Sequence, residues 1–363
     1  MANTPETLIK ISKKKIASIL HDPQKTAKAI NLTYVTDTMP GISRIRKGGK
    51  FEYIFKDKKI DDDEELLRIK HLVLPPAWEN VWICPFADGH LQATGIDVKK
   101  RKQYKYHSSW NKLRNQTKFY GLTEFGKVLP AMRLQMEKDL SLPGLSQDKV
   151  LAAVVSLMER TSIRVGNSFY EKVYGSFGLT TLKDKHVKID GPKVKFTFIG
   201  KKGIAHDITL KHKKLSNIVQ KCRDIPGKEL FQYYDDNGGR HSIDSGMVNE
   251  YIRKISGADF TAKDFRTWSG TVHAFIALRS VGCCDTQTET KRRILAALDS
   301  VSSHLGNTRT VCKKYYVHPQ ILSLYESKEL DKYIRELDEI LVDDSKAELT
   351  PEEKVVLKII ESR

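Results

Sequence analysis

The sequence predicts an α+β protein: a small, mainly β N-terminal domain followed by a larger, mostly α-helical domain that contains a small antiparallel sheet. Three patterns support this prediction. Near the N-terminus, short runs such as residues 51–55 alternate aromatic and polar residues, as strands do. From about residue 108 the apolar residues follow helical spacing. Between residues 187 and 210 the alternation returns between glycine-containing turns. We therefore expect domains at residues 1–107 and 108–363.

The N-terminal domain carries further strand signals. Residues 81–84 and 90–94 have apolar, strand-forming side chains and flank an Asp88-Gly89 turn, which is typical of a hairpin. The acidic run at residues 61–65 has two interpretations, a metal cluster or the acidic first turn of a helix. The helix interpretation is favoured because acidic side chains stabilise the N-terminal end of a helix.

The C-terminal domain begins with a clear amphipathic helix. Its apolar stripe consists of Phe125, Val128, Leu129, Met132 and Met136. Residues 121–128 nearly fit a phosphate-binding loop, but Val128 replaces the required Ser or Thr and no buried strand precedes it. No nucleotide cofactor is therefore expected. Further along, Thr261 and Asp264 have the spacing of a capping box that starts a helix.

Composition indicates a polyanionic partner. The chain has 62 Lys and Arg against 45 Asp and Glu, a net charge of +17. No apolar run approaches the roughly 18 residues of a membrane span, and the N-terminus lacks a signal-peptide core. A cytoplasmic location is expected, with nucleoid association if the host is bacterial. The five cysteines form no CxxC pair, so neither a disulfide framework nor a zinc site is expected.

One segment at the end of the first domain combines cations with aromatic residues. Cations suit phosphate contacts, while amides and aromatic rings can meet bases. A charge run can also be an ordinary solvated face, but the interleaved tyrosines favour DNA binding. The residues that we expect to contact DNA are Lys99, Arg101, Gln103, Tyr104 and Tyr106.

A second basic segment, residues 306–316, contains two adjacent tyrosines, Tyr315 and Tyr316. A tyrosine in basic surroundings can act as a nucleophile toward a phosphodiester. That chemistry needs a deprotonated phenol (reference pKa ~10), cations that neutralise the phosphorane, and a proton for the leaving 5′-oxygen. Arginine suits the second task because its guanidinium stays charged and can grip two phosphate oxygens, and lysine can serve the third.

Three basic residues have suggestive positions. Arg164 follows a predicted helix end, Arg266 lies in the first turns of the capped helix, and Lys201 lies in a glycine turn between two strands. Each one alone could equally be a surface cation or an ion-pair partner. From the residues alone, the chain is a basic DNA-binding protein that could carry a tyrosine nucleophile.

Several segments between Leu32 and Pro319 stand out together, among them Leu74-Pro75-Pro76-Ala77-Trp78, Lys263-Asp264-Phe265-Arg266-Thr267 and Leu305-Gly306-Asn307-Thr308. The others are residues 34–42, 81–85, 89–95, 103–107, 160–167 and 174–182. In these segments and in their order, the sequence resembles the type IB DNA topoisomerases, in the small form found in bacteria and poxviruses and closer to the bacterial branch. The resemblance implies the catalytic core that this family shares with tyrosine recombinases.

The resemblance also implies roles for individual residues. Tyr316 would be the nucleophile that becomes joined to the DNA 3′-phosphate, since spacing from the Gly-Asn-Thr motif favours it over Tyr315. Arg164 and Arg266 match the two arginines that stabilise the transition state, and Lys201 matches the general acid, with Lys202 as the alternative. Asn307 stands where poxviral enzymes have a histidine. It can donate a hydrogen bond to phosphate but cannot exchange a proton.

The activity that the resemblance implies is relaxation of supercoils by transient single-strand cleavage, a 3′-phosphotyrosyl intermediate and religation. Neither ATP nor an obligatory metal is expected, and the enzyme would act as a monomer clamped around double-stranded DNA. Two alternatives are a tyrosine recombinase and a non-catalytic DNA-binding protein. The first is disfavoured because Lys263 replaces the usual histidine of a His-x-x-Arg motif. The second is disfavoured because the catalytic set is intact.

Overall fold

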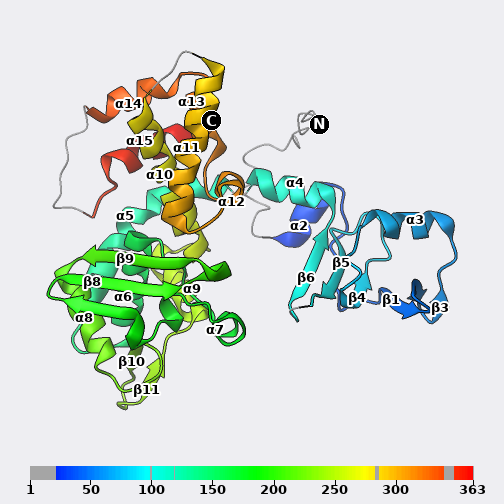
Figure 1. The fold of residues 1–363 in the computed structure, drawn as a ribbon, viewed down its shortest axis with the longest axis horizontal. Coiled ribbons are helices and arrows are strands. Elements are labelled where there is room, and N and C mark those ends of the chain that lie inside the picture. The colour runs from blue at the N-terminus through cyan, green and yellow to red at the C-terminus, as the bar shows by residue number, and fades with distance from the viewer. Residues whose placement is uncertain (1–21, 99, 118, 283–285, 339–346, 363) are drawn as a thin grey trace. The chain divides into compact units, whose positions relative to one another are not determined.

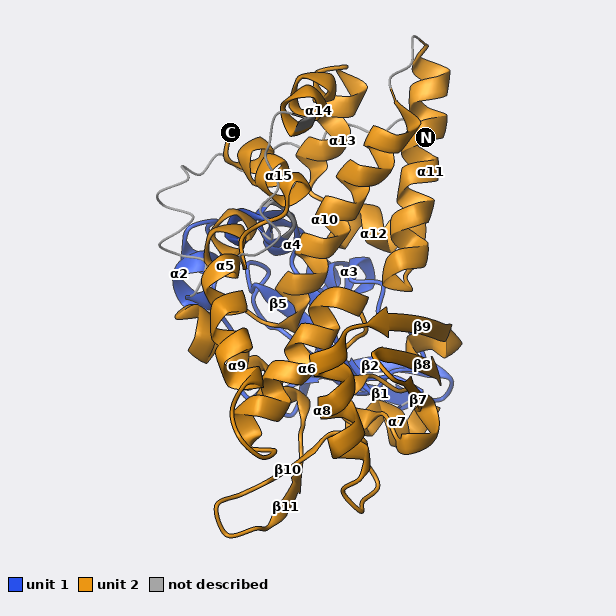
Figure 2. Ribbon diagram, turned by 90° about the vertical axis from the view of Figure 1, so that its left-hand side faces the viewer, with its two compact units in different colours: residues 1–121 blue, residues 122–363 orange. Residues whose placement is uncertain are grey.

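The computed structural model describes residues 22–98, 100–117, 119–282, 286–338 and 347–362 (Figure 1). The chain divides into two compact units, residues 1–121 and 122–363 (Figure 2). The boundary thus follows Gly121 rather than His107 as the sequence pattern suggested. The reason is helix α4 (Ser108–Thr117), whose Trp110 is buried against Ala27 and Leu32. The change to helical periodicity near residue 108 therefore does not coincide with the change of core.

Unit 1 is built on a six-stranded antiparallel sheet with strand order β3-β2-β1-β4-β5-β6. Helices α2 (Pro23–Lys28) and α3 (Asp63–His71) accompany it. The strands are β1 (Ile42–Lys47), β2 (Lys50–Phe55), β3 (Lys58–Lys59), β4 (Glu79–Ile83), β5 (Leu91–Ile96) and β6 (Lys102–Tyr106). The hairpin expected around Asp88-Gly89 is present as β4 and β5, although the pairing contains an irregularity near Trp82.

The acidic run before α3 starts that helix. The carboxylate of Asp62 accepts a hydrogen bond from the backbone N–H of Glu65 at 2.9 Å, which satisfies a donor that helix geometry leaves unpaired. The helix interpretation of this run is therefore correct. Ile69 from α3 packs against Ile42 and Ile83 of the sheet.

Unit 2 is mostly helical and contains a three-stranded antiparallel sheet of order β7-β8-β9. Figure 1 shows β8 and β9 side by side, with α8 next to them. Its helices are α5 (Tyr120–Leu140), α6 (Gln147–Thr161), α7 (Ser168–Tyr174), α8 (Lys213–Arg223), α9 (Ser245–Ser256), α10 (Ala262–Val281), α11 (Gln287–Leu305), α12 (Arg309–Tyr315), α13 (Pro319–Glu326), α14 (Leu330–Asp338) and α15 (Pro351–Glu361). Its strands are β7 (Val187–Asp190), β8 (Lys193–Ile199), β9 (Ala205–Lys211), β10 (Gln232–Tyr234) and β11 (Arg240–Ser242). The two units together have the α+β class that the sequence predicts.

Helices α6 and α10 form the centre of unit 2. Residues 149–158 of α6 are all buried, and α10 contacts α6, α11 and α15 (Figure 2). The predicted capping box is present, because the Asp264 carboxylate accepts hydrogen bonds from both the N–H and the hydroxyl of Thr261 at 2.9 Å. Arg266 in this helix bonds to the carbonyl groups of Ser162 and Leu305, so the end of α6, the start of α10 and the end of α11 meet. None of the described helices is both long and apolar enough to cross a membrane.

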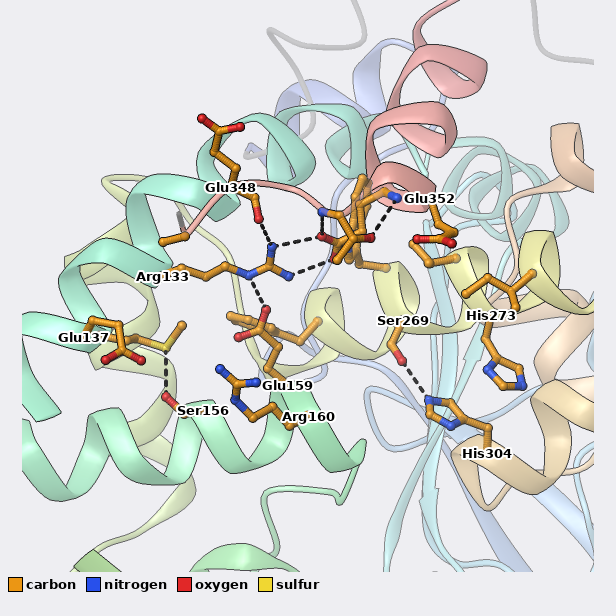
Figure 3. Close-up of a pocket in the computed structure, with 18 residues that line it drawn as sticks. Arg133, Glu137, Ser156, Glu159, Arg160, Ser269, His273, His304, Glu348 and Glu352 are labelled. Carbon is orange, nitrogen blue, oxygen red and sulfur yellow. Dashed lines mark hydrogen bonds and ion pairs between the residues drawn. The ribbon is translucent and has the colours of Figure 1, made fainter. Parts of the chain in front are cut away.

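A mostly buried network of ion pairs and a hydrogen bond connects four helices of this unit (Figure 3). Arg133 of α5 donates to Glu159 of α6 at 2.7 Å and to both carboxylate oxygens of Glu353 of α15. Glu353 also accepts a hydrogen bond from the indole of Trp268 in α10 at 2.9 Å. Burial alone would lower the pKa of Arg133, but the two glutamates raise it above its usual value.

We expect Arg133→Met to lower the free energy of unfolding by about 3–5 kcal/mol, because it leaves two mostly buried carboxylates without their cation. Urea denaturation measures the change. As a control, Arg253→Met removes the exposed pair with Asp259 and should have a much smaller effect. Equal losses in the two variants would contradict the role that we assign to the network.

Candidate active site

Two arginine side chains are held in place by the ends of neighbouring helices. Arg266 of α10 donates to the carbonyl oxygens of Ser162 and Leu305, the latter at 2.7 Å. Arg164 donates to the carbonyl oxygen of Gly306 at 2.9 Å and to Oδ1 of Asn307 at 2.5 Å. Acceptors at the end of α11 therefore fix both guanidinium groups, and the end of α6 supplies one further acceptor to Arg266.

The local backbone explains why these acceptors are available. Ser162 and Gly306 are the C-cap residues of α6 and α11, and both have left-handed backbone angles, with φ of 54° and 58°. The last carbonyl groups of any α-helix have no partner within the helix, and a left-handed C-cap satisfies only some of them. Here the carbonyl groups of Ser162, Leu305 and Gly306 accept from the arginines instead. These groups carry the negative end of the helix dipole, which favours a nearby cation. Each helix end is thus suited to an arginine.

Among the described residues, no acid compensates the charge of the two arginines. In the part of the chain that the structure describes, neither Arg164 nor Arg266 forms an ion pair with a carboxylate. Burial, and then the neighbouring Arg164, lower the pKa of Arg266 to about 10, while Tyr316 opposes this shift. Burial also lowers the pKa of Arg164. Both groups remain charged at neutral pH, and a pair of partly desolvated cations favours a multivalent anion such as phosphate.

Tyr316 lies against this pair. It follows α12 directly, it is half-buried, and the centroid of its ring is 5.5 Å from the guanidinium carbon of Arg266. The close approach of α10 depends on Gly270, because a Cβ atom there would lie 2.7 Å from the carbonyl oxygen of Tyr316. The hydroxyl of Thr271 donates to the same oxygen at 3.3 Å. By contrast, Tyr315 is 38% exposed, with the ammonium group of Lys314 at 5.4 Å from its ring centroid.

Two buried hydrogen-bond donors also favour phosphate binding at this place. The side-chain nitrogen of Asn307 and Nε of Arg266 are both buried and have no hydrogen bond of normal geometry. The amide oxygen of Asn307 already accepts from Arg164, so its NH₂ group is the part that remains unpaired. Buried donors are rarely left unpaired in proteins without a functional reason. Together with the two guanidinium groups, they form a donor set that matches the non-bridging oxygens of a phosphodiester.

Lys201 lies outside this cluster. It begins a single 3₁₀ turn, Lys201–Gly203, between β8 and β9, and its side chain is exposed. Its ammonium group is 5.7 Å from the ring centroid of Tyr170 in α7. Lys202, the alternative, is also exposed and has a left-handed backbone with φ of 64°. The structure therefore brings together Arg164, Arg266, Asn307 and Tyr316, whereas Lys201 contacts an aromatic ring nearby on α7.

Several supporting residues were not anticipated from the sequence. The hydroxyl of Ser162 hydrogen-bonds to Ser269 at 2.9 Å and to Nε2 of His304 at 3.1 Å. His304 in turn stacks on His273, with ring centroids 4.4 Å apart, at the wall of a cavity of about 830 Å³ (Figure 3). Partial desolvation of the ring, followed by His273 and Arg266, lowers the pKa of His304 to about 4, so the ring is neutral at neutral pH although the residue is partly open to solvent. A single Ser or His in a sequence does not indicate that its side chain supports an arginine site, so these contacts could not be predicted.

The candidate DNA-contacting residues lie in unit 1, on or next to the edge strand β6. Tyr104 is half-exposed and stacks on Tyr106 at 6.1 Å. The side chains of Arg101 and Gln103 bind the carboxylate of Asp97, at 2.6 Å and 2.9 Å, so they are not simply extended into solvent. Lys99 lies outside the described residues.

Comparisons with known proteins agree with this geometry. Residues 107–341 match the family model of the catalytic core of eukaryotic DNA topoisomerase I, and residues 50–97 match that of the N-terminal domain of bacterial DNA topoisomerase IB. DNA topoisomerase 1B of Acanthamoeba polyphaga mimivirus is 31% identical over 301 residues, which cover 80% of this chain and 88% of the relative. DNA topoisomerase 1B of Vaccinia virus (strain Copenhagen) is 23% identical over 277 residues, which cover 74% and 84%.

A match of this extent defines the class of enzyme. The chain belongs to the type IB DNA topoisomerases. Its reaction is therefore the ATP-independent topological change of DNA, and DNA is its partner.

We expect Asn307→Asp to reduce the rate of DNA cleavage by about 10²–10³-fold. The substitution removes the unpaired NH₂ donor and places a negative charge beside Arg164, where it would neutralise the cation and repel phosphate. Single-turnover cleavage of a duplex oligonucleotide measures the effect. Asn237→Asp adds the same charge in the exposed loop between β10 and β11 and should cleave normally. Normal cleavage by Asn307→Asp would exclude a phosphate contact at this position.

Proposed function

We propose that the enzyme relaxes supercoiled DNA by reversible transesterification at Tyr316. The phenol loses its proton and its oxygen attacks the phosphorus, which joins Tyr316 to the 3′-phosphate. The bond to the 5′-oxygen breaks, and that oxygen takes up a proton to become a hydroxyl. Religation reverses these changes. The observation that carries this proposal is the contact of Tyr316 with Arg266, one of two neighbouring arginines that have no acidic partner among the described residues.

Arg164, Arg266 and Asn307 stabilise the phosphorane in this proposal. The trigonal-bipyramidal state carries more negative charge on its non-bridging oxygens than the starting diester does. Fixed donors that are held before the reaction begins stabilise that charge without reorganising. The contacts of both guanidinium groups with backbone carbonyl oxygens support this role, because they hold the donors in position.

Lys201 is the general acid in this proposal and donates a proton to the leaving 5′-oxygen. Its position on a turn with an exposed side chain supports this role, because such a side chain can reorient when DNA is present. The role requires that the ammonium group leave the ring of Tyr170. A four-carbon side chain allows that movement without rearranging the strands on either side.

Neither ATP nor a metal ion is required by this mechanism. One phosphodiester is exchanged for one phosphotyrosine ester, so the bond energy is retained for religation. The arginines supply the positive charge that a metal ion supplies in other phosphoryl-transfer sites. We further propose that the enzyme acts as a monomer that closes around the duplex with both units, and that it works in the cytoplasm, with nucleoid association in a bacterial host. The net charge of +17 supports the clamp.

The purified protein should relax both positively and negatively supercoiled plasmid in EDTA and without ATP, as gel electrophoresis would show. Tyr316→Phe should abolish relaxation and the covalent protein–DNA adduct, because phenylalanine has no oxygen to attack phosphorus. Tyr315→Phe is the matched control and should retain both. An adduct that persists in Tyr316→Phe and disappears in Tyr315→Phe would assign the nucleophile to Tyr315.

We expect Lys201→Ala to slow cleavage of ordinary DNA by about 10²–10⁴-fold, the usual contribution of a positioned acid. A substrate with a 5′-bridging sulfur should restore cleavage, because a thiolate leaves without protonation. Lys202→Ala is the matched control and should cleave both substrates at nearly the normal rate. If sulfur rescues Lys202→Ala and not Lys201→Ala, the acid is Lys202.

A further inference from the structure

One histidine lies between the turn that carries Lys201 and the turn that carries Asn307. His206 belongs to β9 and is paired with Phe198 of β8. The two rings stack with centroids 4.8 Å apart and planes 16° from parallel. This stacking fixes the imidazole on one face of the β8–β9 hairpin, and the side chain is half-buried there.

The edge of the imidazole fits between two glycines. A Cβ atom added to Gly306 would lie 2.8 Å from Cε1 and 3.3 Å from Nε2 of His206. A Cβ atom added to Gly200 would lie 2.7 Å from Cδ2 and from Nε2. Gly200 directly precedes Lys201, and Gly306 directly precedes Asn307. The ring therefore touches the backbone next to the candidate general acid and the backbone next to a phosphate-binding residue.

The charge of His206 suits this position. Burial, followed by the positive charges of Arg164 and Arg266, lowers the pKa of His206, so the ring is neutral at neutral pH. A neutral ring can approach two guanidinium groups without repulsion. Among the described residues, neither ring nitrogen has a hydrogen-bond partner, so the ring acts through shape and packing rather than through a polar bond.

We propose that His206 is a positioning residue that holds the Lys201 turn against the Gly306–Asn307 turn. It thereby allows the proton donor and the phosphate-binding groups to reach the same phosphate. The side chains of Arg164 and Arg266 are fixed by their own carbonyl partners rather than by the hairpin. Loss of the ring should therefore affect proton delivery by Lys201 more than phosphate binding. This inference rests on the proposed role of Lys201.

The test compares His206→Ala on two duplexes that differ only in the 5′-bridging atom, oxygen or sulfur. With oxygen, single-turnover cleavage should slow by about 10–100-fold, the cost typical of a displaced catalytic group. With sulfur, the rate should return to within a few-fold of that of the unmodified enzyme, because the leaving group no longer needs a proton. Equal slowing on both substrates, or normal cleavage on both, would overturn the proposal.

Two further variants make the result interpretable. Thr209→Ala changes an exposed side chain on the opposite face of β9 and should cleave both substrates normally. Lys201→Ala is measured in parallel. If sulfur rescues Lys201→Ala but not His206→Ala, the positioning role is wrong and the proposed general acid stands. If sulfur rescues neither variant, the proposed general acid itself is wrong.

Gly200→Ala tests the same contact from the other side. Gly200 has φ of −95°, which any residue can adopt, so the added methyl group acts mainly by pushing on the imidazole. Alone, this substitution should slow cleavage of the oxygen substrate. In the His206→Ala background, where the methyl group meets no ring, it should cause no further loss. Additive losses would overturn the proposal, and the single Gly200→Ala variant decides the matter if thermal melting shows that His206→Ala does not fold.

Discussion

The arrangement of unit 2 depends on placing two guanidinium groups side by side, with no acid among the described residues to neutralise them. Such a pair is costly unless its donors are satisfied, and here the acceptors are backbone carbonyl groups of Ser162, Leu305 and Gly306. That solution requires α6 and α11 to end at the same place where α10 begins. The left-handed caps of α6 and α11 and the close packing of Gly270 against Tyr316 are parts of the same arrangement.

Local sequence patterns predicted the parts of this arrangement that depend on neighbouring residues. The capping box at Thr261, the acidic start of α3 and the three-stranded sheet were all evident from residue type and spacing. Arg266 was a candidate because it lies in a capped helix. Its carbonyl partner Ser162 is 104 residues away, however, and no periodicity reports a contact across such a separation. The choice between equally basic residues came from resemblance to a family, not from spacing.

What the sequence could not predict depends on tertiary packing. The two compact units divide after Gly121 rather than after His107, because Trp110 packs on residues near the N-terminus. The contacts of Arg101 and Gln103 with Asp97 arise because the chain turns back at the start of β6. The position of His206 could not be predicted, since an isolated histidine in an alternating strand is common. Its place became evident only from the structure, where Gly200 and Gly306 lie next to the ring. The contact of Lys201 with Tyr170 likewise depends on how α7 meets the hairpin.

The division into two units separates two properties of the enzyme. All five candidate catalytic residues belong to unit 2, while the described candidate DNA-contacting residues belong to unit 1. The candidate residues for bond exchange and the candidate residues for DNA contact are therefore supported by different hydrophobic cores. A substitution that weakens the packing of one core leaves the packing of the other intact.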